Sequence, residues 1–522
     1  MTEEVWGSKM KNLLKIMTNR IIIIVFLIIL QLAVLLTVVW RFNDFFVYFY
    51  ATNIVISIFI VLKIINNRSN PAYKIAWLVP IMLIPIFGTA IYLIFGRVRF
   101  KKSEKIKMFI IQKKEKEANE RTVTALDMSG LSLDARAQAH YLSHFGESSL
   151  FVNSSSRYFP LGEEAFQAML EEMEKAEKYL FLEYFIIAEG KMWDTILEVM
   201  VRKAREGVDV RLMYDDFGCL LTLPHNYDKE LERMGIKCCI FNQINPVLSP
   251  IFNNRNHRKI LVIDGKVAFT GGINLADEYI NQYERFGHWK DNAIMVKGEV
   301  AWGFTLLFLS LWEYSRGKER DYAYYFPGYE ALRLAAGEES QGYYHPYVDS
   351  PFDKEDVGMN VYLNLIYRAE KYVYITTPYL VIDNLLTEAL TTAAKSGVDV
   401  HIITPHIPDK WYVHEVTRSN YARLMESGVR IFEYTPGFIH SKTFVVDGEY
   451  ATVGTVNLDY RSLYLHFENG IWMYQSPSVQ EVLQDHLHTE ALSQEMTLED
   501  VHRVSWLRTM LRAVLGVFSP LL

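Results

Sequence analysis

The chain carries one pattern of residues twice, and this duplication constrains its fold more than any other feature. Residues 257–274 read HRKILVIDGKVAFTGGIN, and residues 440–457 read HSKTFVVDGEYATVGTVN. Both fit His-x-Lys-x4-Asp-x6-Gly-x2-Asn without a gap. The fixed positions are His257, Lys259, Asp264, Gly271 and Asn274 in the first copy, and His440, Lys442, Asp447, Gly454 and Asn457 in the second. Two ungapped matches at all of these positions predict a chain built from two similar halves.

Each copy of the motif predicts a short strand that ends in a tight turn. The Lys is followed by a β-rich apolar run, and Asp-Gly closes that run at 264–265 and again at 447–448. Because alternate residues of a strand point to the same face, the His and Lys of each copy project side by side. An imidazole can act as nucleophile or proton donor near pH 7, and an ammonium with a nearby amide can hold phosphate oxygens. Together, the two copies predict one site for phosphoryl transfer.

The sequence around the motifs is also repeated. KYLFLEYFI (178–186) and GVDVRLMYDD (207–216) in the first half are matched by KYVYITTPYLV (371–381) and GVDVHIITPH (397–406) in the second. A helical stretch separates the two strands of each pair, which predicts an α/β fold with a mostly parallel sheet in each half. Because each half has one motif His and one motif Lys, we expect the halves to pack together with both motifs at the seam.

The amino end of the chain contains three apolar runs. The first, residues 21–40, is uncharged and has the length that crosses a hydrocarbon core. No small-residue cleavage site follows it, which predicts a retained anchor and not a removable signal peptide. The other runs cover residues 45–62 and 76–95, and two prolines in the last run predict a kink or partial entry. We therefore expect residues 1–98 to form a membrane anchor with two or three transmembrane helices.

Basic residues flank these runs, and the densest cluster follows the third run. That cluster consists of Arg97, Arg99, Lys101 and Lys102. Basic loops favour the cytoplasmic side, so we expect a multi-pass membrane protein with its catalytic part facing the cytoplasm. Charged residues continue beyond the cluster and predict a helical linker over residues 99–145.

Net charge and cysteine content narrow the classes of function. The net charge of −7 and the pI near 6.1 argue against a nucleic-acid binder, which usually has a strong basic excess. The three cysteines (Cys219, Cys238 and Cys239) have no metal-site spacing and do not predict a disulfide scaffold. We expect them to be small buried apolar residues.

With their surrounding segments, the paired motifs resemble the bacterial cardiolipin synthases of the phospholipase D superfamily. The segments that carry the resemblance are FGR (95–97), EYFI (183–186), TPYLVID (377–383) and FEN (467–469). The resemblance implies two phospholipase D-like domains that form a pseudo-twofold pair, over residues 146–325 and 326–498.

The resemblance also implies a mechanism without metal or other cofactor. One His attacks phosphorus and forms a phosphohistidine, while the other protonates the leaving alcohol and then activates the incoming one. We assign His257 as the nucleophile and His440 as the acid and base. The candidate catalytic set contains His257, Lys259, Asp264, His440, Lys442 and Asp447, and we expect its two aspartates to serve structure in the turns. Asn274 and Asn457 are the candidate phosphate ligands.

Members of the superfamily place a carboxylate downstream of each motif His to hold its ring. In this chain Asp291 and Glu468 fall at those positions. The implied reaction converts two phosphatidylglycerol molecules into cardiolipin and glycerol, and the implied location is the plasma membrane of a bacterium. The sequence leaves open a phospholipase D, another phosphatidyltransferase such as a phosphatidylserine synthase, and a non-catalytic scaffold that binds anionic lipid. The acidic balance and the anchor disfavour a nuclease.

Residues 499–522 end the chain with an amphipathic pattern. Arg508 and Arg512 lie one turn apart among apolar side chains. The pattern predicts a helix that either lies at the membrane interface or packs on its own domain.

Overall fold

The computed structural model describes residues 46–521 and isolated residues between 29 and 40. Within 46–521 it leaves out residues 68, 97–99, 123–127, 147, 245–252, 339 and 354. The predicted apolar run over residues 21–40 therefore lies largely outside the described residues. The chain divides into two compact units, one of residues 1–99 with 242–253 and the other of residues 100–241 with 254–522.

The amino-terminal unit contains three described helices, α3 (Phe46–Ile65), α4 (Pro71–Leu83) and α5 (Pro85–Phe95). The apolar run over 76–95 is broken between α4 and α5, because Pro85 has no N–H to donate and disfavours helix at the residue before it. A hydrogen bond of 2.8 Å between the hydroxyls of Ser57 and Thr89 joins α3 to α5. Among the described residues, no helix combines the length and the apolar character that crossing a membrane requires.

Residues 100–241 and 254–522 contain two sheets with the same strand order. The first runs β1-β8-β6-β5-β2-β3-β4, and the second runs β9-β16-β15-β14-β10-β11-β12 with β17 added at its edge. The first sheet comprises β1 (Ser154–Phe159), β2 (Tyr179–Tyr184), β3 (Asp209–Asp215), β4 (Lys237–Phe241), β5 (Ile260–Ile263), β6 (Val267–Gly271) and β8 (Ala293–Gly298). The second comprises β9 (Tyr343–Asp349), β10 (Tyr372–Thr376), β11 (Asp399–Pro405), β12 (Arg430–Tyr434), β14 (Thr443–Val446), β15 (Tyr450–Gly454), β16 (Glu468–Tyr474) and β17 (Ser493–Glu495). This correspondence confirms the predicted duplication.

The prediction of mostly parallel sheets is wrong, because both sheets are mixed. Only β2-β3-β4 and β10-β11-β12 run parallel, and the remaining strands pair antiparallel. The tight Asp-Gly turn that follows each motif strand reverses the chain at once, and such a hairpin joins antiparallel strands only. The pairing of Ile263 with Val267 closes this hairpin in the first half, and that of Val446 with Tyr450 closes it in the second.

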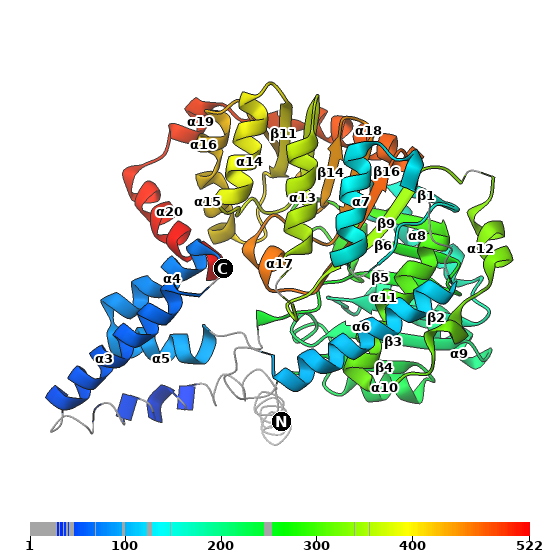
Figure 1. The fold of residues 1–522 in the computed structure, drawn as a ribbon, viewed down its shortest axis with the longest axis horizontal. Helices are drawn as coiled ribbons and strands as arrows, with labels where there is room; N and C mark the ends of the chain where they lie inside the picture. The colour runs from blue at the N-terminus through cyan, green and yellow to red at the C-terminus, as the bar shows by residue number, and fades with distance from the viewer. Residues whose placement is uncertain are drawn as a thin grey trace, which may run out of the picture. The chain divides into compact units, whose positions relative to one another are not determined.

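Helices connect the parallel strands and cover the sheets (Figure 1). The crossovers are α9 (Lys191–Arg205) and α10 (Tyr227–Arg233) in the first half, and α14 (Asn384–Lys395), α15 (Trp411–Ser419) and α16 (Tyr421–Met425) in the second. Further helices are α8 (Gly162–Met173), α12 (Tyr329–Ala336), α13 (Val357–Arg368), α17 (Tyr460–Tyr464), α18 (Pro477–Ala491) and α19 (Leu498–His502). All three cysteines are free and buried, as predicted.

Helix α11 (Glu299–Arg316) is buried along residues 300–313 and forms much of the core that the halves share. The predicted charged linker contains α6 (Lys102–Thr122) and α7 (Leu133–Phe145). Helix α6 packs against α11, and the indole of Trp302 donates to the hydroxyl of Thr122 at 2.8 Å. At least this part of the segment is therefore packed onto the two-sheet unit and does not lie free between domains.

The two halves exchange backbone hydrogen bonds at their seam. Strand β13 (Gly437–Ile439) of the second half pairs in parallel with β7 (His288–Lys290) of the first. An isolated bridge joins Asn256 to Phe467 in the same way. These two crossings lie directly before His440 and His257, so they position both motifs.

Candidate active site

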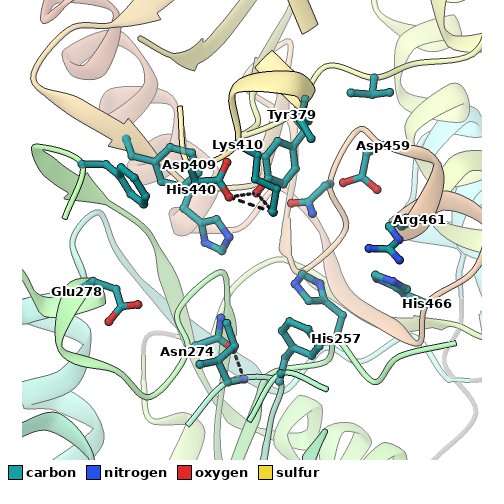
Figure 2. Close-up of a pocket in the computed structure, with 18 of the residues that line it drawn as sticks. His257, Asn274, Glu278, Tyr379, Asp409, Lys410, His440, Asp459, Arg461 and His466 are labelled. Atoms are coloured by element: carbon teal, nitrogen blue, oxygen red, sulfur yellow. Dashed lines mark hydrogen bonds and ion pairs between the residues drawn. The ribbon is translucent and has the colours of Figure 1, made fainter. Parts of the chain in front are cut away.

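Both motif histidines line one cavity of about 410 Å³ (Figure 2). The backbone N–H of His257 donates to the carbonyl of Phe467 at 2.9 Å, and that of His440 donates to the carbonyl of Lys290 at 2.7 Å. Each histidine is therefore held by a backbone segment of the opposite half. The predicted convergence of the two motifs at the seam is confirmed.

The carboxylates that hold the rings are exchanged between the halves. Nδ1 of His257 lies 2.9 Å from Oε2 of Glu468, and Nδ1 of His440 lies 2.6 Å from Oδ2 of Asp291. Both carboxylates predicted from the sequence are therefore at the site, but each serves the histidine of the other half. With Nδ1 bonded to a fully buried carboxylate, Nε2 of each ring is left for the cavity.

Burial favours the neutral form of both imidazoles. Burial and then the charge of Lys259 lower the pKa of His257 well below its usual value. Burial and the charge of Lys442 lower the pKa of His440 to about 4, although Asp291 opposes this shift. A neutral ring keeps a lone pair that can attack an electrophile, so both histidines are in their nucleophilic form.

The motif lysines are fully buried behind the histidines. Nζ of Lys259 donates to the carbonyl of His257 at 2.7 Å, and Nζ of Lys442 donates to the carbonyl of His440. Burial lowers the pKa of Lys259 to about 7 and that of Lys442 to about 8, and nearby carboxylates counter part of each shift. Neither side chain lines the cavity itself.

The motif asparagines both line the cavity. Asn274 is fixed, because its oxygen accepts from the N–H of Ile186 at 3.0 Å and its amide nitrogen donates to the hydroxyl of Tyr279 at 2.7 Å. The side-chain oxygen of Asn457 is buried and has no hydrogen-bond partner among the described residues.

The motif aspartates lie in the turns at the far ends of the motif strands. The carboxylate of Asp264 accepts three backbone N–H groups, those of residues 177–179, at 2.8–3.0 Å. Asp447 accepts those of residues 370–372 in the same way. Neither aspartate lines the cavity. This geometry agrees with an anchoring role, in which each aspartate ties the motif turn to the start of the first parallel strand.

The motif glycines allow strands to approach closely behind the site. A Cβ atom on Gly271 would lie 2.3 Å from the carbonyl oxygen of Asn292, and one on Gly454 would lie 2.5 Å from that of Asn469. Those asparagines directly follow the carboxylates Asp291 and Glu468. Any larger residue at either glycine would displace the strand that carries a carboxylate.

Several residues at the site were missed by the sequence analysis. The ring of His440 is surrounded by Tyr279, Trp289 and Phe438, with centroids 5.6, 5.6 and 5.9 Å away. The ring of His257 has Phe185 at 5.1 Å and His466 at 5.8 Å. The sequence did contain one signal for Trp289 and His466. Each lies two positions before a carboxylate that holds a motif histidine, so both could have been placed near the site.

Other polar side chains line the same cavity. Tyr379 donates to Asp409 at 2.6 Å, and Lys410 lies 3.0 Å from both of them. Arg285 pairs with Glu278 at 3.3 Å. Arg461 from α17 also faces the cavity.

Two groups of described side chains have the spacing of metal ligands. One contains His257, His466 and Glu468, with ligand atoms within 4.8 Å of one another. An ion there would have to replace the hydrogen bond that holds the ring of His257. The other group (His401, His486 and Glu490) does not line the cavity.

Comparison with known proteins places these features in a family. The family model "Cardiolipin synthase, PLD-like domain" matches residues 169–299 and 362–488, and "Phospholipase_D-nuclease N-terminal" matches residues 55–97. An uncharacterized protein of Streptococcus mutans is 42% identical over 88% of this chain and 99% of its own length. A cardiolipin synthase of Geobacillus kaustophilus is 34% identical over 89% of this chain and 92% of its own length.

A solved structure shares the fold. The crystal structure of phosphatidylserine synthase from Haemophilus influenzae aligns with a TM-score of 0.54 and 16% identity. The alignment covers 74% of this chain and 98% of that protein. At this level of identity the likeness shows the fold alone.

Proposed function

Because this chain belongs to the cardiolipin synthases of the phospholipase D superfamily, we propose that it transfers a phosphatidyl group from one phosphatidylglycerol to another, giving cardiolipin and glycerol. The observation that carries the proposal is the pair of histidines that face one cavity, each held by a carboxylate of the other half. This arrangement supplies a nucleophile on one side of a phosphorus atom and a proton donor on the other.

In the first step Nε2 of His257 attacks the phosphorus of the donor lipid. The P–N bond forms as the bond from phosphorus to the glycerol oxygen breaks, and His440 gives its proton to that oxygen. A bound phosphodiester anion favours the protonated form of His440, which takes a proton from solvent as the lipid binds, while His257 stays neutral.

In the second step the phosphatidyl group leaves His257. His440, now neutral, takes the proton from the terminal hydroxyl of the second phosphatidylglycerol, whose oxygen attacks phosphorus. The P–N bond breaks, and cardiolipin is released with His257 neutral and His440 protonated again. The proton that His440 takes from the acceptor hydroxyl replaces the one that it gave to glycerol, so the cycle balances.

The motif asparagines contact the non-bridging oxygens, and the motif lysines stabilise the charge on them from a longer distance. Charge spreads over these oxygens as phosphorus becomes five-coordinate, and fixed donors stabilise that charge at no cost in reorganisation. Asn274 is held in place by two hydrogen bonds before any ligand arrives. The buried Lys259 and Lys442 supply positive charge from behind the two rings.

We further propose that the amino-terminal unit attaches the enzyme to the plasma membrane and that the catalytic domains face the cytoplasm. Many apolar side chains of α3 are exposed, including Ile58, Phe59 and Leu62, and lipid would cover them. Protease added outside intact spheroplasts should leave the catalytic domains uncut. Digestion of these domains under those conditions would refute the orientation.

The carboxyl-terminal helix offers a second contact with the bilayer. Helix α20 (Trp506–Phe518) packs on α15, and Glu415 of α15 accepts from Arg508 at 2.9 Å and from Arg512 at 2.8 Å. With its arginines used in this way, α20 leaves Trp506 and Leu507 more than 60% exposed. The segment after it reaches the cavity, because Ser519 is part of the lining. An apolar helix face beside the cavity suits an enzyme whose substrates are lipids.

Product analysis tests the proposed reaction. The purified full-length enzyme is incubated with phosphatidylglycerol in mixed micelles, and the lipids are separated. Cardiolipin with an equal amount of glycerol supports phosphatidyl transfer, whereas phosphatidic acid alone shows a phospholipase D and unchanged lipid shows a scaffold. His257→Ala and His440→Ala should each abolish cardiolipin formation, and a variant that kept full activity would refute these roles.

A further inference from the structure

Strand β11 and helix α18 bring together three side chains that can bind a metal ion, and none of the three lines the catalytic cavity. They are His401 of β11 and His486 and Glu490 of α18, and one ligand atom from each lies within 4.8 Å of the other two. His486 and Glu490 are four residues apart, so they project from the same face of the helix. His401 is 4% exposed and His486 is 2% exposed. Two imidazoles and one carboxylate form a donor set that binds zinc in proteins.

The distances between the ligand atoms are close to those of a metal site. Nδ1 of His401 lies 2.7 Å from Oε2 of Glu490, and Nε2 of His486 lies 3.8 Å from the same oxygen. Zinc binds nitrogen and oxygen at about 2.0–2.2 Å, so the ligand atoms around a tetrahedral ion lie about 3.3–3.6 Å apart. The two distances lie on either side of this range, and small side-chain shifts would bring all three atoms into it.

The nitrogen of His486 that faces Glu490 has no hydrogen-bond partner. This atom, Nε2, is buried and makes no hydrogen bond with any residue that the structure describes. The other ring nitrogen, Nδ1, lies 3.2 Å from the hydroxyl of Thr376. When Nδ1 donates to this hydroxyl, Nε2 keeps a lone pair inside the protein. Because a buried polar atom without a partner costs free energy, a lone pair beside two other ligand atoms indicates a place for a cation.

The imidazole of His401 has the support that metal-binding histidines have. Its Nε2 lies 3.0 Å from Oδ1 of Asp399 and 3.1 Å from Nη1 of Arg430. In the tautomer that donates to Asp399, Nδ1 directs its lone pair toward Glu490, and a carboxylate behind a ligand histidine is a common feature of zinc sites. The other tautomer accepts from Arg430 and donates to Glu490, so a bound metal would select the first. The ring of Tyr374 stacks on both imidazoles, with centroids 4.5 and 5.0 Å away, and holds their planes.

The charge around the three ligands favours a divalent cation. Four charged side chains surround them, namely the carboxylates of Asp399, Glu490 and Glu495 and the guanidinium of Arg430. Three negative charges therefore stand against one positive charge. The charge of Lys290 also acts on His486, but an ion pair of 2.7 Å with Asp485 offsets it.

We propose that His401, His486 and Glu490 bind one zinc ion, with a water molecule as the fourth ligand on the side where Glu490 is partly exposed. The ion ties α18 to β11. Asp485, the residue before His486, pairs with Lys290 of the first half at 2.7 Å. The zinc site therefore stabilises a helix that connects the two halves, and it takes no part in phosphoryl transfer.

The test measures zinc binding to the full-length enzyme, purified without a polyhistidine tag and stripped of metal with a chelator. Titration of Zn²⁺ against a fluorescent zinc indicator gives the stoichiometry and the Kd, and thermal melts are recorded with and without zinc. His486→Gln and Glu490→Gln each remove one ligand. Asp399→Asn removes the carboxylate behind His401. His488→Gln is the matched control, because His488 is exposed on the same helix.

A further variant separates this site from the catalytic cavity. His466→Gln removes one member of the other group with the spacing of metal ligands, which includes His257 and Glu468. If zinc binds at α18 and β11, this variant keeps the affinity of the wild type.

We expect one zinc ion per chain. Asp399→Asn should weaken binding about 10- to 100-fold, as loss of a residue that orients a ligand does, and loss of a ligand in His486→Gln or Glu490→Gln should weaken it more. Zinc should raise the Tm of the wild type and of His488→Gln but not that of Glu490→Gln, whose partly exposed side chain tolerates the change even if His486→Gln does not fold. Failure of the wild type to bind zinc overturns the site. An affinity that falls in His466→Gln and not in Glu490→Gln also overturns it.

Discussion

The ring of His257 is held by Glu468, a residue of the opposite half, across 2.9 Å. The exchange is reciprocal, since Asp291 of the first half holds His440 of the second. Neither half therefore contains both a motif histidine and the carboxylate that holds its ring. Replacing either carboxylate should therefore impair the histidine that it contacts, which belongs to the other half. The motif histidine that precedes the carboxylate in its own half should be unaffected.

A lipid donor with an activated leaving group allows the His257–Glu468 and His440–Asp291 pairs to be tested separately. With phosphatidyl-p-nitrophenol the leaving group needs no proton, so the first step depends on His257 and the second on His440. Asp291→Asn should give a fast burst of p-nitrophenol followed by slow turnover, whereas Glu468→Gln should lose the burst, with a rate on the order of 10³-fold lower. Stopped-flow absorbance measures both phases. The opposite pattern would show that each carboxylate serves the histidine of its own half or that the two histidine roles are reversed.

We expect the motif aspartates to contribute to the free energy of unfolding and not to the catalytic steps. Asp264→Asn weakens the three backbone hydrogen bonds of the buried carboxylate, and we expect the free energy of unfolding to fall by about 1–3 kcal/mol. Urea titration monitored by fluorescence measures this change. Asp194→Asn, at an exposed position of α9, is the control and should change stability by less than about 0.5 kcal/mol. A folded Asp264→Asn enzyme with a kcat reduced 100-fold would contradict the anchoring role.

The lowered pKa values of Lys259 and Lys442 predict that activity declines in alkaline solution. A lowered pKa means that the ammonium is lost at a lower pH, and the values are about 7 for Lys259 and about 8 for Lys442. Because the charged form attracts the phosphodiester, kcat/KM should fall as the pH rises through 7 to 8. Initial rates at low lipid concentration in mixed micelles, from pH 6 to 9, measure the profile. Activity that stays level up to pH 9 would show that neither ammonium is needed in the free enzyme.

We expect the exposed apolar face of α20 to increase the rate of the enzyme on lipid bilayers and to have no effect on its rate in detergent micelles. Leu507→Asp combined with Met510→Asp places two charges on that face, and each lost apolar contact with lipid costs about 1–2 kcal/mol. We expect the rate on phosphatidylglycerol vesicles to fall at least about tenfold relative to the rate in mixed micelles. Leu334→Asp on α12, which is 67% exposed, is the matched control and should leave this ratio unchanged. An unchanged ratio in the α20 variant would argue against membrane contact by this helix.

The sequence predicted the motif residues and the duplication because both are local patterns. Asp264 was placed correctly in a turn, since Asp-Gly after an apolar run fixes a hairpin without help from the rest of the chain. The presence of one sheet in each half was predicted from the segments that match between the two halves. The antiparallel strands that flank the parallel core were missed, because a strand carries the same alternation in either direction.

The features that depend on packing between the halves could not be predicted. Nothing near Glu468 in the sequence indicates that it faces His257, since that contact arises only when the halves dock. Helix α6 was expected to be a charged linker because its apolar residues are few, yet Met108 and Ile111 are buried. Even Glu115 is buried there, and burial raises the pKa of this carboxyl to about 7. Among the cavity residues, Arg461 and Lys410 lie outside the motifs and carry no spacing that identifies them.

The pairing of the segment before His257 with the segment around Phe467 has a consequence for synthesis on the ribosome. When the first half emerges, its reactive ring has neither its carboxylate nor the backbone segment that holds it. A complete pair of imidazole and carboxylate around His257 therefore forms only after residue 468 has been translated and the two halves have folded together.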